Sequence, residues 1–240
     1  MANNYFNFKT FSIQQEGCAM KVCTDSCLFG AWVANHISTK EHAPENILDI
    51  GAGTGLLTLM LAQKTEAAFV AIEIDKTAAT MAKENVLNAM MQNHMEIIEA
   101  DFLLFDFKKK FDLIISNPPF YDNDLNSPNE EINMARHQNR LTIESLAMQC
   151  ATVVNDDGEI ALLAPFKRED VFLEAMQKVG FLPQEICRVK HHLNKPFIRS
   201  MMIFRKQATT LRSSEIEIRD HQNNYSSRFV ELLSDYYLDL

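Results

Sequence analysis

Short apolar runs alternate along the chain with longer segments in which apolar residues recur at helical spacing. Continuous apolar runs predict buried strands, and apolar residues three or four positions apart predict amphipathic helices. The expected strands span residues 47–50, 69–74, 96–99, 111–116 and 159–164. The expected helices span residues 56–63, 76–91, 143–154 and 168–179. This alternation predicts an α/β fold with a doubly wound parallel sheet.

Two further strands are expected after Gly180, over residues 184–189 and 200–205. The polar loop between them contains Asn194 and Pro196, so we expect an antiparallel hairpin. A hairpin at one edge would bring the mostly parallel sheet to seven strands.

The predicted strands divide the chain into a central domain with an extension at each end. Residues 1–45 form an N-terminal extension that we expect to pack on the core, and residues 46–206 form the central domain. Residues 207–240 form a C-terminal extension, in which the apolar spacing of residues 225–233 predicts a helix.

Length and composition favour one large α/β domain with modest additions, because 240 residues that are 47% hydrophobic can bury a full core. We see no apolar stretch long enough to span a membrane, and the first residues do not resemble an export signal. The expectation is a cytoplasmic protein, with a monomer favoured.

Five cysteines, an odd number without paired spacing, are typical of reduced thiols and not of a disulfide framework. Cys18, Cys23 and Cys27 cluster near the start, but the only matching pair downstream is His191 and His192. We therefore expect buried structural cysteines and no metal.

A net charge of −9 argues mildly against a nucleic-acid partner, because phosphate contacts need Lys and Arg. The charge is unevenly distributed, however, since residues 186–206 contain no acid. The basic residues of this stretch are Arg188, Lys190, Lys195, Arg199, Arg205 and Lys206. The stretch is either a solvated face or a surface for a polyanionic partner.

A glycine-rich turn, Gly51-Ala52-Gly53-Thr54-Gly55, joins the first expected strand to the first helix. Glycines at such a turn allow backbone to approach a ligand closely. The turn lacks the Lys-Ser/Thr pair of a phosphate loop, and its third glycine comes too early for the dinucleotide fingerprint. A tight turn without a ligand is the alternative, but three of the seven glycines in one turn favour a ligand.

Two acidic positions extend this candidate site. Glu73 ends the next strand, where a carboxylate can accept both ribose hydroxyls of a nucleoside. Asp101 follows the third strand and could accept from an adenine amino group, with Phe102 covering the ring. An ordinary exposed acid is the alternative for Glu73. Together the positions predict an adenosine-like ligand.

Over residues 45–205 this ordered set resembles the class I methyltransferases. The resemblance implies a Rossmann-like fold and S-adenosylmethionine as cofactor. It places the glycine turn under the methionine end, the strand-end acid at the ribose and the Asp-Phe pair at the adenine. The matching positions are Asp49, Gly51, Gly53, Glu73, Asp101 and Phe102.

Asn117-Pro118-Pro119-Phe120 follows the fourth expected strand. The prolines fix the backbone, so that the Asn117 amide oxygen and the Pro118 carbonyl can both accept from a target amino group. The nitrogen lone pair of that amino group is then free to attack a methyl group, and Phe120 can stack on a flipped base. A rigid turn without chemistry is the alternative. The polar segment that follows, up to Ile143, is long for a compact domain.

Asn-Pro-Pro-aromatic resembles the signature of methyltransferases that act on adenine, on the guanine amino group or on protein glutamine. A wider similarity is to the bacterial tRNA1(Val) (adenine-37) methyltransferases. It runs through almost the whole chain and includes residues 6–32, Ala135-Arg136-His137 and the tail from Tyr225 to Leu238. That resemblance implies a tRNA substrate and places Thr24 and Asp25 near the methionine moiety. Cys23 departs from the glycine of that pattern.

Several interpretations compete at this point. The resemblance implies binding of the cofactor by Asn117 as well, and we expect RNA contacts from Arg136, His137, Lys195 and Arg199. A protein-glutamine methyltransferase would share the motif but usually carries a larger N-terminal domain. A nucleotide-binding or RNA-binding module without catalysis would not need both sets of residues.

Overall fold

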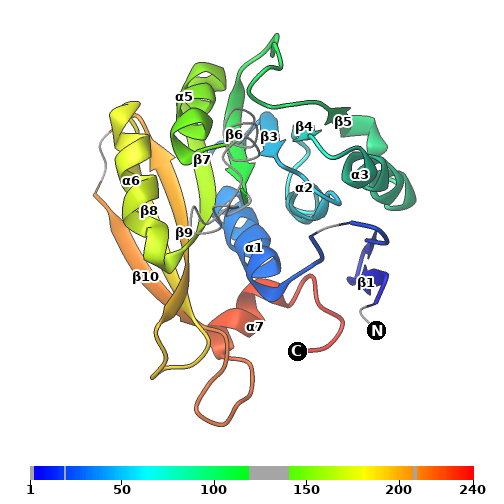
Figure 1. The fold of residues 1–240 in the computed structure, drawn as a ribbon. Coiled ribbons are helices and arrows are strands. Elements are labelled where there is room, and N and C mark those ends of the chain that lie inside the picture. Colours follow the sequence, from blue (N-terminus) through cyan, green and yellow to red (C-terminus); the bar gives the residue numbers. More distant parts are fainter. Residues whose placement is uncertain (1–2, 19, 119–140, 208–209) are drawn as a thin grey trace, which may run out of the picture.

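The structure is a computed structural model that describes residues 3–18, 20–118, 141–207 and 210–240. Within these ranges eight strands form one sheet in the order β10-β8-β9-β7-β6-β3-β4-β5 (Figure 1). Its strands are β3 (Asn46–Ile50), β4 (Ala68–Glu73), β5 (Met95–Glu99), β6 (Phe111–Ser116), β7 (Val154–Pro165), β8 (Leu182–Lys190), β9 (Phe197–Arg205) and β10 (Arg212–Glu217). A separate hairpin pairs β1 (Tyr5–Asn7) with β2 (Ser12–Gln14).

The expected helices of the central domain are confirmed, with small shifts at their ends. They are α2 (Leu56–Ala62), α3 (Lys76–Asn88), α5 (Ile143–Val153) and α6 (Glu169–Lys178). The N-terminal extension contains α1 (Thr24–Ser38), which was not predicted, and the C-terminal extension contains α7 (Ser227–Leu233), where a helix was expected. Two single 3₁₀ turns, η1 (Gln92–His94) and η2 (Phe166–Arg168), lie before β5 and after β7. The third helix ends earlier than predicted, and Met90 just beyond it adopts a left-handed conformation with φ of 56°.

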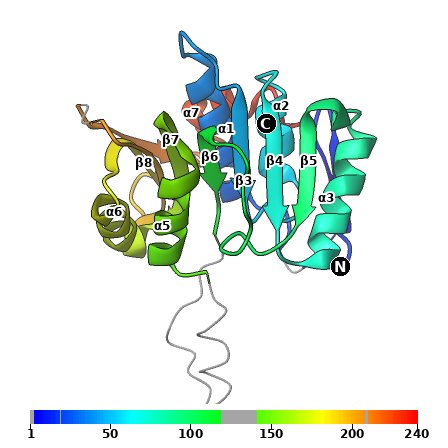
Figure 2. The same ribbon diagram turned by 90° about the horizontal axis from the view of Figure 1, so that it is seen from above.

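The central strands are parallel and in register, so their carboxyl ends meet at one edge of the sheet (Figure 2). Ile50 at the end of β3 lies opposite Ile72 of β4 and Ser116 of β6. Glu73, the last residue of β4, lies opposite Glu99 of β5. Side chains that follow these strands therefore share one edge, where ligands bind in open α/β sheets.

Alternate residues of the strands feed two apolar cores on opposite faces of the sheet. Ile47, Phe69 and Leu113 pack with α1, α2 and α7 on one face. Leu48 and Val70, one position further along their strands, pack with α5 and α6 on the other. The strands are thus buried on both sides, which explains their continuous apolar sequence.

The expectation of a mostly parallel sheet with an antiparallel hairpin is confirmed, but the strand count and the edge are corrected. The hairpin of β8 and β9 is followed by an additional strand, β10, which pairs in parallel with β8. In the part of the chain that the structure describes, the sheet therefore has eight strands, and β8 is not at its edge. Of β10 only Ile216 is buried, so the segment has no apolar run by which it could be predicted.

Both ends of the chain pack on the central domain. The buried Asn85 of α3 accepts from the backbone N–H of Gln14 at 2.8 Å and donates to the carbonyl of Thr54 in the glycine turn at 2.9 Å. The hydroxyl of Tyr236 donates to the carbonyl of Met60 at 3.1 Å. The hydrogen bonds of Asn85 thus tie the N-terminal hairpin to the glycine turn that it flanks. In the part of the chain that the structure describes, no helix combines the length and apolar character needed to cross a membrane.

Candidate active site

The turn after β3 leaves an open space at the carboxyl edge of the sheet. Gly51 and Gly53 have φ of +68° and +57°, in the left-handed region that favours glycine. A Cβ atom at either position would meet no described atom within 4 Å. The glycines therefore serve backbone conformation, and they also keep clear a space against which a ligand can lie.

Glu73 lies beside this turn and is 9% exposed. Its Oε2 accepts from the N–H of Gly53, and its Oε1 from the N–H of Asp75, both at 2.8 Å. Each carboxylate oxygen has more than one acceptor site. Both oxygens therefore remain able to accept from a ligand while the backbone holds them in place.

Asp49 lies in β3, two residues before Gly51, and is fully buried. Its Oδ2 accepts from the hydroxyl of Thr58 at 2.6 Å and from the N–H of Thr58 at 3.1 Å. Its Oδ1 has no hydrogen-bond partner among the described residues. Burial raises the pKa of this carboxyl to about 7, outweighing the Thr58 hydrogen bonds, and the negative charge of Glu73 also raises it. A positively charged ligand would favour the ionised form.

Asp101 and Phe102 follow β5 but face different surroundings. Oδ1 of Asp101 accepts from the N–H of Leu103 at 2.9 Å, which fixes the carboxylate at the sheet edge. Phe102 is 5% exposed and belongs to the second apolar core, with its ring centroid 5.8 Å from that of Phe107. Its ring thus contributes to the core of the domain, and its contact with an adenine stays a prediction.

Asn117 follows β6 directly opposite the glycine turn, because Ser116 pairs with Ile50 and its hydroxyl donates to the Ile50 carbonyl at 2.8 Å. The amide nitrogen of Asn117 donates to the hydroxyl oxygen of Ser26 at 2.9 Å. Its amide oxygen is buried and has no hydrogen-bond partner among the described residues. Pro118 is buried next to it. An unpaired buried acceptor is costly unless a ligand supplies a donor.

The first turn of α1 supplies the neighbours of Asn117. Thr24 is exposed at the first position of the helix, and Ser26 is buried two positions later. Asp25 accepts from the guanidinium of Arg199 at 2.6 Å. Cys23 has φ of −132° and ψ of 155°, an extended conformation that does not need glycine. No role was predicted for Ser26, although the run of Thr, Asp and Ser at the start of a helix is a signal of a polar first turn.

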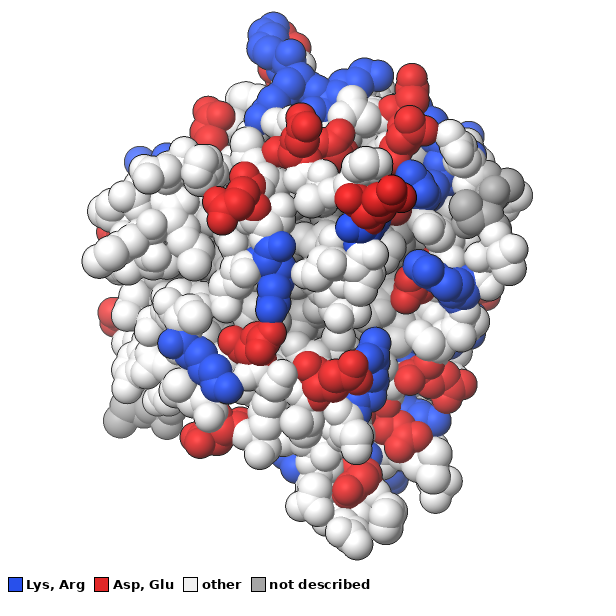
Figure 3. Space-filling view, turned by 180° about the vertical axis from the view of Figure 1, so that it is seen from behind, with Lys and Arg blue, Asp and Glu red and all other residues white. Residues whose placement is uncertain are grey.

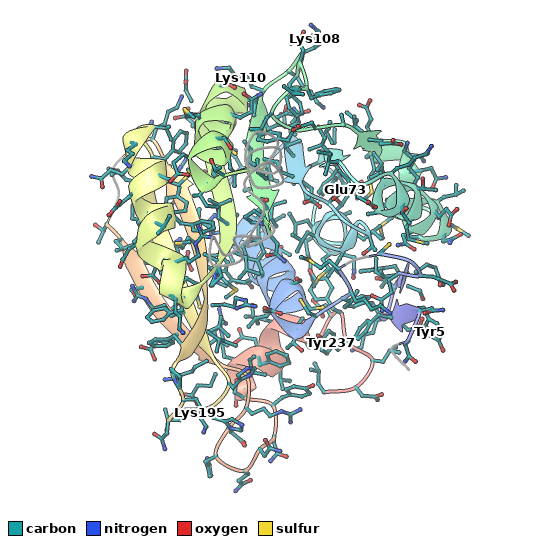
Figure 4. All side chains as sticks on the ribbon, viewed as in Figure 1. Tyr5, Glu73, Lys108, Lys110, Lys195 and Tyr237 are labelled. Carbon is teal, nitrogen blue, oxygen red and sulfur yellow. The ribbon has the colours of Figure 1, made fainter. Side chains whose placement is uncertain are left out.

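The basic stretch of residues 186–206 is largely neutralised by acids from other elements. Arg188 pairs with Glu169, Lys190 with Glu215, Arg199 with Asp25, Arg205 with Glu159 and Lys206 with Asp156. Arg199 belongs to β9 and not to the hairpin loop in which it was expected. Lys195 is exposed at the tip of that loop, without an ion pair to any described residue, and lies away from Glu73 (Figure 4).

The remaining predicted residues, Phe120, Arg136 and His137, lie outside the described residues. The face behind the view of Figure 1 carries acidic and basic side chains side by side (Figure 3). The excess of acidic residues is thus not gathered into a single patch on that face.

A mostly parallel sheet in this order, with a glycine turn after its first central strand and Asn-Pro-Pro after its fourth, defines the arrangement of a class I methyltransferase. The family model described as methyltransferase small domain matches residues 30–164. The chain therefore belongs to the methyltransferase small domain family, within the group of full-length relatives named tRNA1(Val) (adenine(37)-N6)-methyltransferase.

Three of these relatives come from distinct bacteria. The protein of Christiangramia forsetii is 37% identical and that of Bacteroides thetaiotaomicron 36% identical, with 100% of each chain covered. The protein of Haemophilus influenzae is 36% identical and covers 97% of this chain and 98% of its own. The family resemblance inferred from the sequence is confirmed.

The solved structures confirm the fold. A predicted O-methyltransferase from Agrobacterium tumefaciens superposes with a TM-score of 0.66 at 16% identity, over 88% of this chain and 96% of that one. A methyltransferase from Pyrococcus furiosus gives a TM-score of 0.58 at 20% identity, over 82% and 90% of the two chains. At these identities the likeness concerns the fold alone.

Proposed function

We propose that this protein transfers a methyl group from S-adenosylmethionine to the exocyclic nitrogen N6 of adenine 37 in tRNA1(Val). The observation that carries the proposal is the buried amide oxygen of Asn117, which has no partner among the described residues and lies beside the open glycine turn. Relatives that span the whole chain and carry the corresponding name support the same substrate. Because that substrate is a tRNA, we place the reaction in the cytoplasm.

The residues at the sheet edge fit S-adenosylmethionine. Glu73 has acceptor sites for the two ribose hydroxyls, and Asp101 has a carboxylate oxygen for the adenine amino group. The space beside Gly51 and Gly53 suits the methionine end, and the unpaired oxygen of Asp49 suits a positive charge. When bound, the cofactor supplies an electrophilic methyl group on a sulfonium cation.

The contribution of the chain to the chemistry is to prepare the attacking nitrogen. The lone pair of an exocyclic amino group is delocalised into the base, so the nitrogen is a poor nucleophile. Acceptance of its two N–H groups by the Asn117 amide oxygen and the Pro118 carbonyl favours a pyramidal nitrogen whose lone pair points at the methyl group. This electrostatic preorganisation is typically worth about 10²–10³ in rate per group.

Base and tRNA contacts complete the proposal. Phe120 would stack on the flipped adenine, and Arg136, His137 and Lys195 would contact the phosphate backbone. Lys195 has no described acid to compete with a phosphate, which supports this role. Arg199 already pairs with Asp25, so its contribution to RNA binding would be smaller.

The test uses S-adenosylmethionine with a labelled methyl group and two transcripts of tRNA1(Val), one with adenine and one with guanine at position 37. The expected result is labelled N6-methyladenosine from the first transcript and no product from the second. The Asn117→Ala variant serves as the catalytic control. Label on guanine, or on glutamine of a protein added in place of tRNA, would overturn the substrate assignment. Failure to bind S-adenosylmethionine in calorimetry would overturn the enzyme assignment.

A further inference from the structure

We propose that Ser26 is a positioning residue that fixes which end of the Asn117 amide faces the substrate. It acts through a one-directional chain of hydrogen bonds with Cys23, Asp25 and Arg199. This inference rests on the proposed function, in which the amide oxygen accepts from the target amino group. It assigns to Ser26, in the first turn of α1, a role that neither the motif nor the family resemblance supplies.

The orientation of the Asn117 amide decides whether the site works. A carboxamide presents an acceptor oxygen at one end and a donor NH₂ at the other, on a group of nearly the same shape. If the Asn117 oxygen faces the substrate, it can accept a hydrogen bond from the target amino group. If the Asn117 NH₂ faces the substrate, two donor groups face each other. Since β6 ends at Ser116, the backbone alone does not choose between the two orientations.

The chain of donors starts at Arg199. Its Nε donates to Oδ2 of Asp25 at 2.6 Å. Burial acts to raise the pKa of Asp25, but the hydrogen bond with Cys23 and the charge of Arg199 outweigh it, so the pKa is lowered. Asp25 is therefore ionised at neutral pH and can only accept hydrogen bonds.

The thiol of Cys23 links Asp25 to Ser26 and decides which of the two groups donates at each step. Burial and the neighbouring Asp25 raise the pKa of the thiol, which therefore keeps its proton. Asp25 lies two residues further along the chain and can only accept, so we infer that the single thiol proton is directed to its carboxylate. The sulfur then has only acceptor capacity left toward the hydroxyl of Ser26, whose oxygen lies 3.0 Å away.

Ser26 completes the chain. Its single proton is donated to the sulfur, so its oxygen can only accept from Asn117, whose amide nitrogen lies 2.9 Å away. The amide oxygen of Asn117 must then point away from Ser26, and it is this atom that is buried without a described partner. No side-chain hydrogen bond caps α1 within the described residues, so helix capping does not account for the Ser26 hydroxyl.

The test separates positioning from structure by measuring kcat, KM and cofactor affinity together. Ser26→Ala should lower kcat by about 10-fold, less than the roughly 10²-fold loss expected for Asn117→Ala, with an unchanged dissociation constant for S-adenosylmethionine. In the Asn117→Ala background, the Ser26 substitution should lower kcat no further, because the group that it positions is gone. A purely structural role of Ser26 would lower kcat in both backgrounds.

A pair of variants at Cys23 tests the direction of the chain. Cys23→Ala removes the acceptor of the Ser26 proton, which can then be donated to Asn117, so kcat should fall. Cys23→Ser restores a group that donates to Asp25 and accepts from Ser26, so its kcat should be several-fold higher than that of Cys23→Ala. Equal kcat values for the two variants, or wild-type kcat in Ser26→Ala, would overturn this inference. Wild-type kcat in Asn117→Ala would instead overturn the proposed mechanism itself.

Discussion

The backbone N–H of Gly53 donates a hydrogen bond of 2.8 Å to Oε2 of Glu73. The two residues come from different strand ends, and the bond joins the glycine turn to the acid that we expect at the ribose. The other oxygen of Glu73 accepts from the N–H of Asp75 at 2.8 Å. The carboxylate is therefore held on both sides before any ligand arrives, which reduces the entropy cost of binding.

Replacing Glu73 should therefore weaken cofactor binding in two ways. Glu73→Gln presents an NH₂ group to one of the two backbone N–H donors, and it also loses an acceptor for the ribose. We expect S-adenosylmethionine affinity to fall by at least about 10-fold, the effect of losing one charge-assisted hydrogen bond of roughly 1.5–3 kcal/mol. Isothermal titration calorimetry measures this directly. Unchanged affinity would exclude Glu73 from the cofactor site.

Asn117→Ala should separate chemistry from binding. The amide acts on the attacking nitrogen in the transition state, so we expect kcat to fall by about 10² or more while cofactor affinity stays nearly the same. Single-turnover methylation of the tRNA, together with calorimetry of S-adenosylmethionine, gives both values. A variant that kept the turnover of the wild type at saturating tRNA would contradict the mechanism.

Gly53→Ala should harm cofactor binding beyond its effect on stability. Alanine in the left-handed conformation costs roughly 1–2 kcal/mol, and its Cβ would enter the open space that we assign to the cofactor. Gly180 provides a matched control, because its φ is +85° and a Cβ there also meets no described atom within 4 Å. Gly180→Ala carries the same kind of strain at the end of α6, outside the site.

Both variants should therefore lose a similar amount of thermal stability, measured by calorimetry without ligand. Only Gly53→Ala should lose affinity for S-adenosylmethionine. Equal affinities in the two variants would show that the space beside Gly53 is not where the cofactor lies.

The parts of the site that follow apolar strands could be predicted from the sequence. Glu73 and Asn117 end or follow such runs, and parallel pairing brings those ends to one edge. Ser26 could not be predicted in this way, because it lies 91 residues from its partner Asn117. The helix that carries it, α1, is buried on nearly all sides, so it lacks the polar face by which an amphipathic helix is recognised.

The pairing of charged side chains was the feature hardest to predict from the sequence. The stretch of residues 186–206 has no acid along the chain, yet most of its basic side chains meet acids brought by other elements. Arg199 is an example, since its partner Asp25 lies 174 residues away. The additional strand β10 was missed for a related reason: it is held by backbone pairing with β8, and its side chains are mostly polar and exposed.

The buried carboxyl of Asp49 predicts a pH dependence. Burial raises its pKa to about 7 in the folded protein, above the value of an unfolded chain. The folded state thus holds the proton more tightly, so the carboxyl destabilises the fold increasingly as the pH rises from about 4 to about 7. A difference of about three pH units corresponds to roughly 4 kcal/mol once the group is ionised.

Asp49→Asn removes this ionisation while its carbonyl oxygen can still accept from Thr58. Without ligand, the thermal stability of the variant relative to the wild type should therefore improve from pH 5 to pH 8. S-adenosylmethionine is cationic at its sulfonium, so its affinity for the wild type should rise over the same interval, and the variant should lack this rise. Parallel pH profiles of the two proteins would contradict the assignment of Asp49.

An acidic protein needs local positive charge to hold an anionic tRNA. Lys195 is exposed at the tip of the β8–β9 loop without a described ion pair, whereas Arg199 is paired with Asp25. A phosphate contact from Lys195 releases counterions, so Lys195→Ala should reduce the log-log salt dependence of tRNA affinity by about 0.7–0.9 and raise KM for tRNA. Cofactor affinity should not change.

Lys110 is a matched control, because it is an exposed lysine just before β6, at the opposite edge of the sheet (Figure 4). Screening limits its influence on the site to about 10 Å at ordinary salt, so Lys110→Ala should leave the salt dependence as in the wild type. Arg199→Ala should act mainly on kcat, because it removes the first donor of the chain that orients Asn117. If Lys195→Ala and Lys110→Ala gave the same salt dependence, tRNA would have to be held by other residues, and the N-terminal segment around Lys9 and Lys21 would be the next surface to test.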